Sequence, residues 1–239
     1  MTDRRENTDR DRPLLAVLID ADNVPAKHAA SIMREVASIG EPALRRVYGD
    51  WSNDHLKGWK APIRELGLVA HQETANTTGK NASDIGLVID AMDILHTGRF
   101  DVFVIVSSDS DFTSLVNRLR EQGITVIGIG EKKTHDSLRN VYNRFILIEN
   151  LDGTATPDTP RGSTAKAEKA LPLFREAMDK IETEDDWHNL GQVGQAIQAR
   201  HADFDARTYG FGKLSSLVAA LDALETRRTG NRLMIRLKP

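Results

Sequence analysis

The chain has 239 residues, 40% of them hydrophobic and 28% charged, which excludes a disordered chain and allows one large or two small globular domains. A formal net charge of −3 excludes a protein that binds polyanions through its overall charge, so any contact with nucleic acid must come from local basic patches. There is no cysteine, which excludes disulfides, zinc–thiolate sites and thiol catalysis and favours a cytoplasmic protein.

The first 13 residues are rich in arginine and aspartate and contain no apolar core. We therefore expect a disordered arm over residues 1–13 and not a signal peptide. No apolar stretch approaches the roughly 20 residues that span a bilayer, so no membrane association is predicted.

Residues 14–149 alternate short apolar runs with stretches of helical periodicity. Strands are predicted at 14–20, 43–48, 68–71, 101–107, 125–129 and 145–148, and helices near 25–39, 55–66, 82–96, 111–121 and 134–141. Such alternation predicts an α/β fold of three layers with a mostly parallel sheet.

The composition changes after this region. Residues 150–165 hold two prolines, two glycines and four threonines, which predicts a flexible linker. Residues 166–239 form a second predicted domain, with helices at 167–181, 189–200 and 213–224 and a tight turn at Gly230-Asn231 between two strand-like arms. Helices followed by such a hairpin predict a winged helix-turn-helix.

Aspartates follow two of the buried strands. Asp20 ends the apolar run of residues 14–19, and Asp109 and Asp111 follow the run 102–106. Ligands of parallel sheets bind outside the carboxyl ends of the strands. Carboxylates that converge there repel one another unless a cation lies between them, and oxygen-only ligation favours Mg²⁺ or Mn²⁺.

Asp84 is the fourth carboxylate of this predicted site. It opens the helix near 82–96 and lies one turn before Val88, on the apolar face. A carboxylate on that face costs free energy unless it is paired or binds a metal. Asp90, further along the helix, is expected to be exposed to solvent, and the alternative is that it supports the metal ligands from behind.

Each of these aspartates also has a plain structural interpretation. Asp20 could be a turn or capping residue, Asp84 could complement the helix dipole, and one of Asp109 and Asp111 could cap the helix that follows. Either Asp22 or Asn23 is expected to cap the helix that begins after Pro25. A purely structural role is less plausible when several separate strand ends all carry an aspartate.

Several residues near the predicted site are candidates to contact a substrate. Lys80 precedes Asp84 on a loop and could contact a phosphate, and Trp51 could stack on a base. Ser108 could orient the neighbouring carboxylates or cap the helix. A solvated lysine is the alternative interpretation of Lys80.

The end of the chain carries a local basic strip. Arg227, Arg228, Arg232, Arg236 and Lys238 follow Glu225 with no acidic residue between them. Arg228 and Arg232 are the candidate contacts to phosphates, which would make binding depend on salt. The alternative is an edge strand that basic residues protect from aggregation.

The order of three motifs resembles the NYN domain, in particular its LabA-like branch in the PIN-like nuclease superfamily. The motifs are Ile19-Asp20-Ala21-Asp22-Asn23, Lys80-x-x-x-Asp84 and Val106-Ser107-Ser108-Asp109-Ser110-Asp111-Phe112. The resemblance implies a divalent-metal-dependent ribonuclease over 14–149. It also implies Asp20, Asp84, Asp109 and Asp111 as catalytic metal ligands, with Asn23 near the substrate.

Residues 166–239 resemble an OST-HTH/LOTUS domain, through pieces that include Leu190-Gly191-Gln192-Val193-Gly194 and Phe204-Asp205-Ala206-Arg207-Thr208-Tyr209-Gly210. The resemblance implies RNA binding, including G-rich or structured RNA, with Tyr209 and Lys213 as exposed contacts. It also implies a protein partner or homo-oligomer through this domain.

We therefore expect a metal-dependent ribonuclease whose second domain binds RNA. One alternative is a regulatory RNA-binding protein with weak or no catalysis. Another is a phosphatase of the haloacid-dehalogenase type, in which Asp20 would be the nucleophile and Asp22 the general acid, although Asp84 would then have no role.

Overall fold

The computed structural model describes residues 11–52, 54–72, 82–151, 164–183 and 185–238. The chain divides into two compact units, Met1–Asp152 and Gly153–Pro239, and each is described by itself. Among the residues that the structure describes, no helix combines the length and the apolar character needed to cross a bilayer.

The first unit is built on a six-stranded sheet in which every pair of neighbouring strands is parallel. The strand order is β3-β2-β1-β4-β5-β6, so the chain builds outward from β1 in one direction and from β4 in the other. The carboxyl ends of β1 and β4 therefore flank the point where the order reverses, which is where parallel sheets bind ligands. The strands are β1 (Leu14–Asp20), β2 (Glu41–Gly49), β3 (Val69–Gln72), β4 (Val102–Val106), β5 (Thr125–Gly130) and β6 (Arg144–Leu147).

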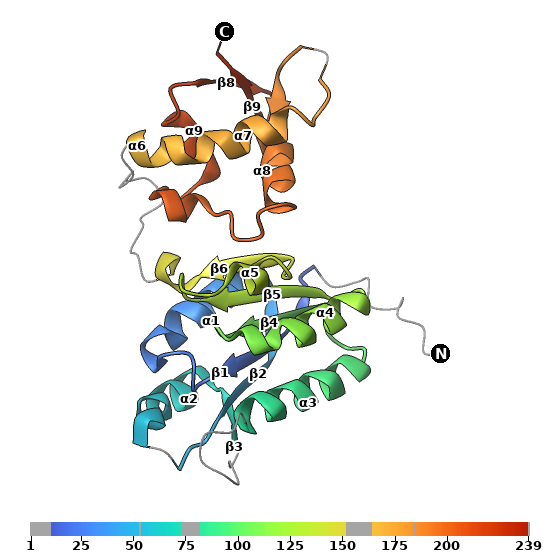
Figure 1. Cartoon of the computed structure of the whole chain (residues 1–239), viewed down its shortest axis with the longest axis vertical. Helices are drawn as coiled ribbons and strands as arrows, with labels where there is room; N and C mark the ends of the chain where they lie inside the picture. The colour runs from blue at the N-terminus through green and yellow to red at the C-terminus, as the bar shows by residue number, and fades with distance from the viewer. Residues whose placement is uncertain (1–10, 53, 73–81, 152–163, 184, 239) are drawn as a thin grey trace. The chain divides into compact units, whose positions relative to one another are not determined.

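Helices cover both faces of this sheet (Figure 1). One face packs against α1 (Ala29–Ile39) and, at its edge, α2 (Lys60–Leu66). The other face packs against α3 (Ala82–His96), α4 (Thr113–Glu121) and α5 (Asp136–Arg139). Because both faces are covered, all residues of β1 and β4 are buried, and these strands consist of continuous apolar runs.

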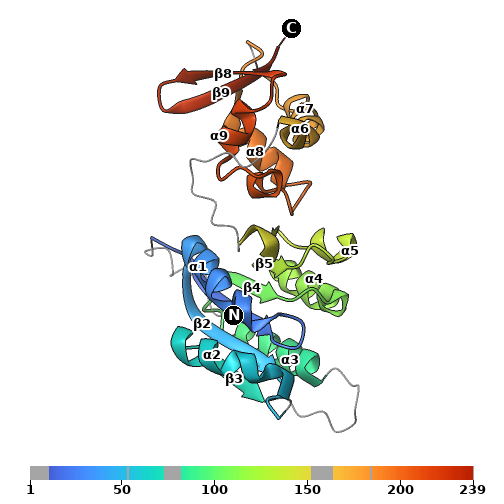
Figure 2. The ribbon, with the colours of Figure 1, turned by 90° about the vertical axis from the view of Figure 1, so that its left-hand side faces the viewer.

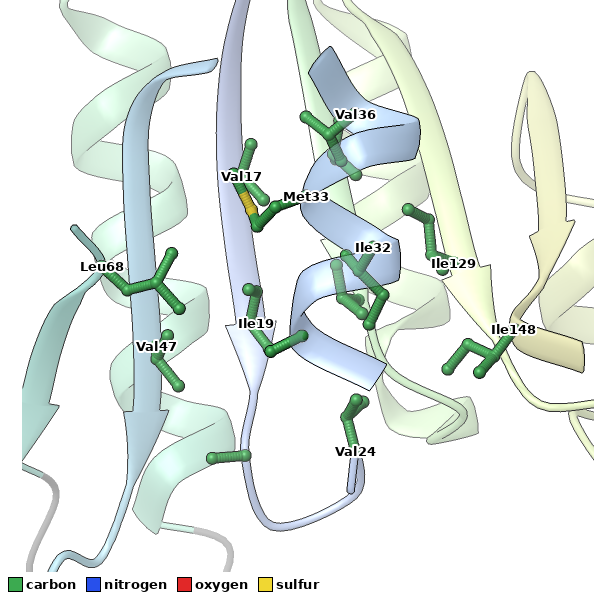
Figure 3. Packing of buried hydrophobic residues seen from close by; sticks show 14 of the residues in the cluster. Val17, Ile19, Val24, Ile32, Met33, Val36, Val47, Leu68, Ile129 and Ile148 are labelled. Atoms are coloured by element: carbon green, nitrogen blue, oxygen red, sulfur yellow. The ribbon is translucent and has the colours of Figure 1, made fainter. Parts of the chain in front are cut away.

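Alternate residues of β1 belong to different layers of the core. Val17 and Ile19 point toward α1, where they contact the layer that includes Ile32, Met33 and Val36 (Figure 3). The intervening residues Ala16 and Leu18 point toward α3 and α4. This alternation fixes the face on which each side chain at the end of the strand emerges.

The predicted α/β fold with a mostly parallel sheet is confirmed, and all six predicted strands are present. Several predicted helices begin as 3-10 turns, which share an i, i+3 spacing of buried residues with α-helices. These turns are η1 (Ala26–His28), η2 (Asp54–Trp59) and η3 (Ser110–Phe112). Ile148, predicted as the end of a strand, instead opens a short 3-10 turn, η4 (Ile148–Asn150).

The second unit has one apolar core between its helices and a small sheet. Its helices are α6 (Thr164–Ala167), η5 (Glu168–Ala170), α7 (Leu171–Met178), α8 (Leu190–Gln198), η6 (Ala206–Tyr209) and α9 (Leu214–Ala219). Strands β8 (Leu224–Thr229) and β9 (Arg232–Leu237) form the predicted antiparallel hairpin (Figure 2). A short strand that the sequence did not reveal, β7 (His188–Asn189), pairs with β9 and completes a three-stranded sheet.

Candidate active site

Asp20 is held by four hydrogen bonds at the end of β1. Its Oδ1 accepts from the backbone N–H groups of Asp22 (3.1 Å) and Asn23 (3.2 Å), and its Oδ2 accepts from Asn23 Nδ2 (2.7 Å) and Ser107 Oγ (2.8 Å). The side chain shares the α3 side of the strand with Ala16 and Leu18, and the residue is only 1% exposed. Burial is the larger influence and raises the pKa of Asp20, although the hydrogen bonds from Ser107 and Asn23 oppose it.

The loop after β4 joins this network through Ser107, which is fully buried. Ser107 Oγ accepts a hydrogen bond from the backbone N–H of Asp109 (3.0 Å) while it donates to Asp20. Asp109 caps η3, because its Oδ1 accepts from the backbone N–H of Asp111 (2.9 Å). The structure thus links the ends of the two central strands, and the capping role left open for this pair belongs to Asp109.

Asp84 lies in the first turn of α3 and is influenced by the same carboxylates. Desolvation is the largest cause that raises its pKa to about 6, followed by repulsion from Asp20, Asp109, Asp22 and Asp111. Each of these residues is therefore near enough to act on Asp84. Hydrogen bonds through Ser107 thus connect Asp20 with the turn of Asp109 and Asp111 at the carboxyl ends of β1 and β4, and Asp84 lies within electrostatic range of all three.

The chemistry of this cluster fits a divalent cation. Every candidate ligand is a carboxylate oxygen, which Mg²⁺ and Mn²⁺ prefer. Repulsion from these carboxylates adds to burial in raising the pKa of Asp84, and a bound cation would relieve that repulsion. Within the described ranges, however, no group of three or more histidine, aspartate or glutamate side chains is arranged as a ready ligand set. The donor atoms fit the ion, and the structure shows no preformed coordination shell.

Asp22 and Asn23 have contacts that differ from those predicted. Neither side chain caps the following helical segment, since Pro25 occupies the capping position of η1 without a side-chain hydrogen bond. The Asn23 amide instead donates to Asp20. Asp22 Oδ1 lies 3.1 Å from His55 Nε2, and its Oδ2 accepts from Ser83 Oγ (2.8 Å). The residue before Asp84 is therefore tied to the loop after β1.

Sequence reasoning missed His55 and the structural role of Ser107. His55 lies in η2 and Ser107 directly follows β4, so both meet residues far away in the sequence. Periodicity reports only the local conformation and gives no signal for such contacts. The serine had one available signal, since it directly precedes the Ser108-Asp109 pair at a strand end.

Asp90 is not exposed to solvent as predicted. Its carboxylate accepts hydrogen bonds from the Tyr48 hydroxyl and from the Arg46 guanidinium, and its side chain is 19% exposed. The pairing follows from geometry, because Asp90 lies on the side of α3 that faces β2, which supplies both partners.

Three further residues near the acidic cluster were predicted to contact a substrate, namely Trp51, Ser108 and Lys80. Trp51 is half-buried, and its indole Nε1 donates to the backbone oxygen of His71 (2.8 Å), so one edge of the ring is occupied. Ser108 Oγ accepts from the backbone N–H of Glu131 (2.9 Å) and therefore connects the loops after β4 and β5. Lys80 lies outside the residues that the structure describes.

The predicted contacts of the second unit are only partly exposed. Lys213 is exposed and precedes α9, whereas Tyr209 is half-buried and its ring lies 6.1 Å from that of Phe204. Burial, and secondarily Asp203, raises the pKa of Tyr209. The predicted exposure of Tyr209 is thus correct only for part of the side chain.

The four arginines of the basic strip divide into two pairs. Arg228 and Arg232 are exposed and make no ion pair with any described residue. Arg227 and Arg236 lie over the indole ring of Trp187, with guanidinium carbons 4.3 Å and 4.7 Å from its centroid. They also pair with acidic side chains, Arg227 with Asp185 (3.2 Å) and Arg236 with Glu225 (2.7 Å).

Comparisons with known proteins agree with this arrangement. The NYN domain family matches residues 14–149, and the OST-HTH/LOTUS domain family matches residues 164–235. No curated protein matches the chain.

A comparison with solved structures adds a likeness of fold in the first case below. A protein of unknown function from Vibrio parahaemolyticus, VPA0982, shares 21% sequence identity over 57% of this chain and 93% of that chain, with a TM-score of 0.50. A LacI-family transcriptional regulator from Brachyspira murdochii, described as an ABC transporter, shares 15% identity over 83% of this chain and 55% of that chain, with a TM-score of 0.29.

The NYN domain is a PIN-like, nuclease-type domain whose members usually use divalent metals, and OST-HTH/LOTUS domains bind RNA. The family matches coincide with the sheet that carries the aspartates and with the winged unit. The chain belongs to the NYN domain family, and an OST-HTH/LOTUS domain follows its NYN domain.

Proposed function

We propose that the protein is a divalent-metal-dependent ribonuclease that hydrolyses phosphodiester bonds of RNA at the carboxyl ends of β1 and β4. The observation that carries this proposal is the hydrogen-bonded link from Asp20 through Ser107 to Asp109 at the ends of β1 and β4. The raised pKa of Asp84, caused first by burial and then by the other carboxylates, agrees with it. Asp20 is buried, Asp84 and Asp109 are half-buried, and Asp111 is exposed. Repulsion among carboxylates at such a partly buried site costs free energy, and groups with perturbed pKa values cluster at functional sites.

Asp20, Asp84, Asp109 and Asp111 would hold Mg²⁺ or Mn²⁺. When bound, such an ion supplies an activated water and stabilises negative charge on the phosphate and the leaving oxygen. The contributions of the protein are orientation and charge. Ser107 and Asn23 donate to Asp20 and fix the direction of its carboxylate, while the capped turn that starts at Asp109 fixes the loop after β4.

The second unit would bind the RNA and increase its concentration near the first. Its exposed guanidinium groups, those of Arg228 and Arg232, would contact phosphates, with Lys213 as a further contact. Residues 150–165 have the composition of a flexible tether, which raises the local substrate concentration when both units bind one RNA. A preference for G-rich or structured RNA, self-association through this unit and a cytoplasmic location stay predictions.

The proposal is tested by incubating the full chain with labelled single-stranded and structured RNAs in Mn²⁺, Mg²⁺ or EDTA, with Asp109→Asn beside the wild type. Metal-dependent cleavage that the variant loses is the expected result. Equal cleavage by both proteins would show that the acidic cluster is not the source of the activity. If both proteins bind RNA and neither cleaves it under any condition, the regulatory RNA-binding alternative is correct.

A further inference from the structure

His55 is oriented by a carboxylate at the edge of the acidic cluster. Its Nε2 lies 3.1 Å from Oδ1 of Asp22, whose backbone N–H donates to Asp20. The other oxygen of Asp22 accepts from Ser83, which directly precedes Asp84. Asp22 also contributes to the raised pKa of Asp84, so His55 is one contact away from the site of the proposed reaction.

The contact with Asp22 determines which nitrogen of the neutral imidazole carries the proton. An ionised carboxylate only accepts hydrogen bonds, so Nε2 must be the donor. The other nitrogen, Nδ1, is then an acceptor with a free lone pair. It makes no hydrogen bond with any residue that the structure describes, and the side chain is 59% exposed.

The charges around His55 disfavour a phosphate as the partner of Nδ1. Asp22 lies on one side, and the carboxylate of Asp50 is a second negative charge within electrostatic range. A neutral donor fits this negative environment better than an anion does. The sugar–phosphate backbone of RNA offers one such donor, the ribose 2′-hydroxyl, and DNA has none.

We propose that Nδ1 of His55 accepts a hydrogen bond from a ribose 2′-hydroxyl next to the cleaved phosphate and thereby selects RNA over DNA. Asp22 is the positioning residue, because it fixes the tautomer and the direction of the ring. This inference rests on the proposed nuclease function and adds the group that recognises the sugar.

Two substitutions of His55 separate recognition from a structural role. His55→Gln keeps a donor near the position of Nε2 for Asp22 but has no acceptor at the position of Nδ1, whereas His55→Asn keeps an acceptor near Nδ1. His96→Gln is the matched control, because His96 is an exposed histidine at the far end of α3.

The substrates are an RNA with a mapped cleavage site and copies with one 2′-deoxy nucleotide at each position around that site. For the wild type, one deoxy position lowers kcat/KM roughly three- to tenfold, the effect of losing a single hydrogen bond. His55→Gln cleaves the all-RNA substrate more slowly by a similar factor and no longer distinguishes the deoxy copy. His55→Asn retains part of the discrimination, and His96→Gln behaves as the wild type does.

The outcomes distinguish the inference from the function on which it rests. If the wild type cleaves and His55→Gln keeps the full preference for the 2′-hydroxyl, the inference is wrong while the nuclease function stands. A change in base preference without a change in the deoxy effect would also overturn it.

A second readout does not require turnover. At about pH 8, where an ordinary imidazole is neutral, ¹⁵N spectra of the full chain report the tautomer of His55, which His55→Gln assigns. The expected spectrum has the proton on Nε2, and the Nδ1 resonance shifts on addition of RNA but not of DNA of the same sequence. A proton on Nδ1, or equal shifts with both nucleic acids, would contradict the proposal.

Discussion

At the scale of single residues, Ser107 connects the two halves of the acidic site. It is fully buried, donates to Asp20 and accepts from the backbone N–H of Asp109. We expect Ser107→Ala to lower the free energy of unfolding by about 1–3 kcal/mol, because both partners lose a hydrogen bond in a buried place. We expect kcat for RNA cleavage to fall roughly tenfold with little change in KM, because the Asp20 carboxylate loses its orientation.

Urea unfolding and steady-state kinetics check this expectation, with Ser114→Ala as the control. Ser114 is exposed on α4 and should tolerate the same change with no effect on either quantity. A Ser107→Ala protein that is destabilised but keeps its full kcat would limit Ser107 to a structural role.

The effect of Tyr142 on the free energy of unfolding depends on pH. Its hydroxyl is buried without a hydrogen-bond partner among the described residues, and burial raises its pKa. The folded state therefore keeps the phenol neutral. The unfolded state can ionise the same phenol at about pH 10, so the protein loses stability as pH rises above the pKa of unfolded tyrosine. We expect Tyr142→Phe to be neutral or stabilising by about 1 kcal/mol at pH 7.

The difference between Tyr142→Phe and the wild type should grow as pH rises above about 10, since only the wild type has a buried phenol to ionise. Chemical denaturation at several pH values measures it. A variant that is less stable than the wild type at every pH would indicate that the hydroxyl has a partner.

The aspartates could be predicted from the sequence, whereas their contacts could not. A buried strand that ends in aspartate is visible in one local run, and parallel strands bring such ends to one edge of the sheet. The bond from Ser107 to Asp20 and the pair formed by His55 and Asp22 join segments 87 and 33 positions apart. No local pattern encodes such pairings, and for the same reason Asp90 was wrongly expected to be exposed.

At the scale of elements, hydrogen bonds to Asp90 connect α3 to β2. The carboxylate of Asp90 accepts from both Arg46 and Tyr48 on that strand. We expect Asp90→Ala to lower the free energy of unfolding by about 1–2 kcal/mol, mainly because the buried Tyr48 hydroxyl loses its acceptor while Arg46 stays partly hydrated. Because α3 also carries Asp84, RNA cleavage should weaken too.

A double-mutant cycle of Asp90→Ala with Tyr48→Phe, followed by urea denaturation, measures this coupling. The two changes should be less than additive, since each removes the same hydrogen bond. Strict additivity would mean that the bond does not contribute to stability.

The elements that could not be predicted are the shortest ones. β7 contains only His188 and Asn189, too few residues to show an alternating pattern, and it exists because β9 offers a free edge. Several ranges predicted as one helix include a 3-10 turn at their start, because the two conformations place buried residues at similar intervals. The long apolar runs β1 and β4 were predicted well because both faces of the sheet are covered.

At the scale of the whole molecule, the basic strip of the second unit should contribute unevenly to RNA binding. Arg228 and Arg232 are exposed without an acidic partner among the described residues, whereas Arg227 pairs with Asp185 and lies over Trp187. For single-stranded RNA, we expect Arg228→Gln and Arg232→Gln each to reduce the slope of log K against log salt by about 0.7, the loss of one phosphate contact. Arg227→Gln should change the slope less.

Fluorescence anisotropy of a labelled RNA over a range of salt concentrations checks this order. If Arg227→Gln reduces the slope as much as Arg232→Gln does, the pairing with Asp185 does not keep that guanidinium from the RNA. If none of the substitutions changes the slope, the strip serves to protect the sheet edge.

The architecture of the first unit could be predicted as a class but not in its strand order. Alternating strands and helices predict a parallel sheet, and several orders of six strands satisfy that pattern. The observed order reverses between β1 and β4, which is what brings the loops that carry Asp20 and Asp109 together. Contacts among distant strands decide this order, and the sequence alone did not provide it.

The measurement that tests the central claim most directly is metal-dependent RNA cleavage by Asp84→Asn and Asp93→Asn, side by side with the wild type. Both aspartates lie on α3, but Asp84 interacts with the acidic cluster and Asp93 is exposed. The account predicts that Asp84→Asn loses roughly 100-fold or more of the activity, as expected when a group that binds or orients a metal is removed. It predicts that Asp93→Asn retains the activity, and equal activity of the two variants would contradict the assignment of the acidic cluster as a nuclease centre.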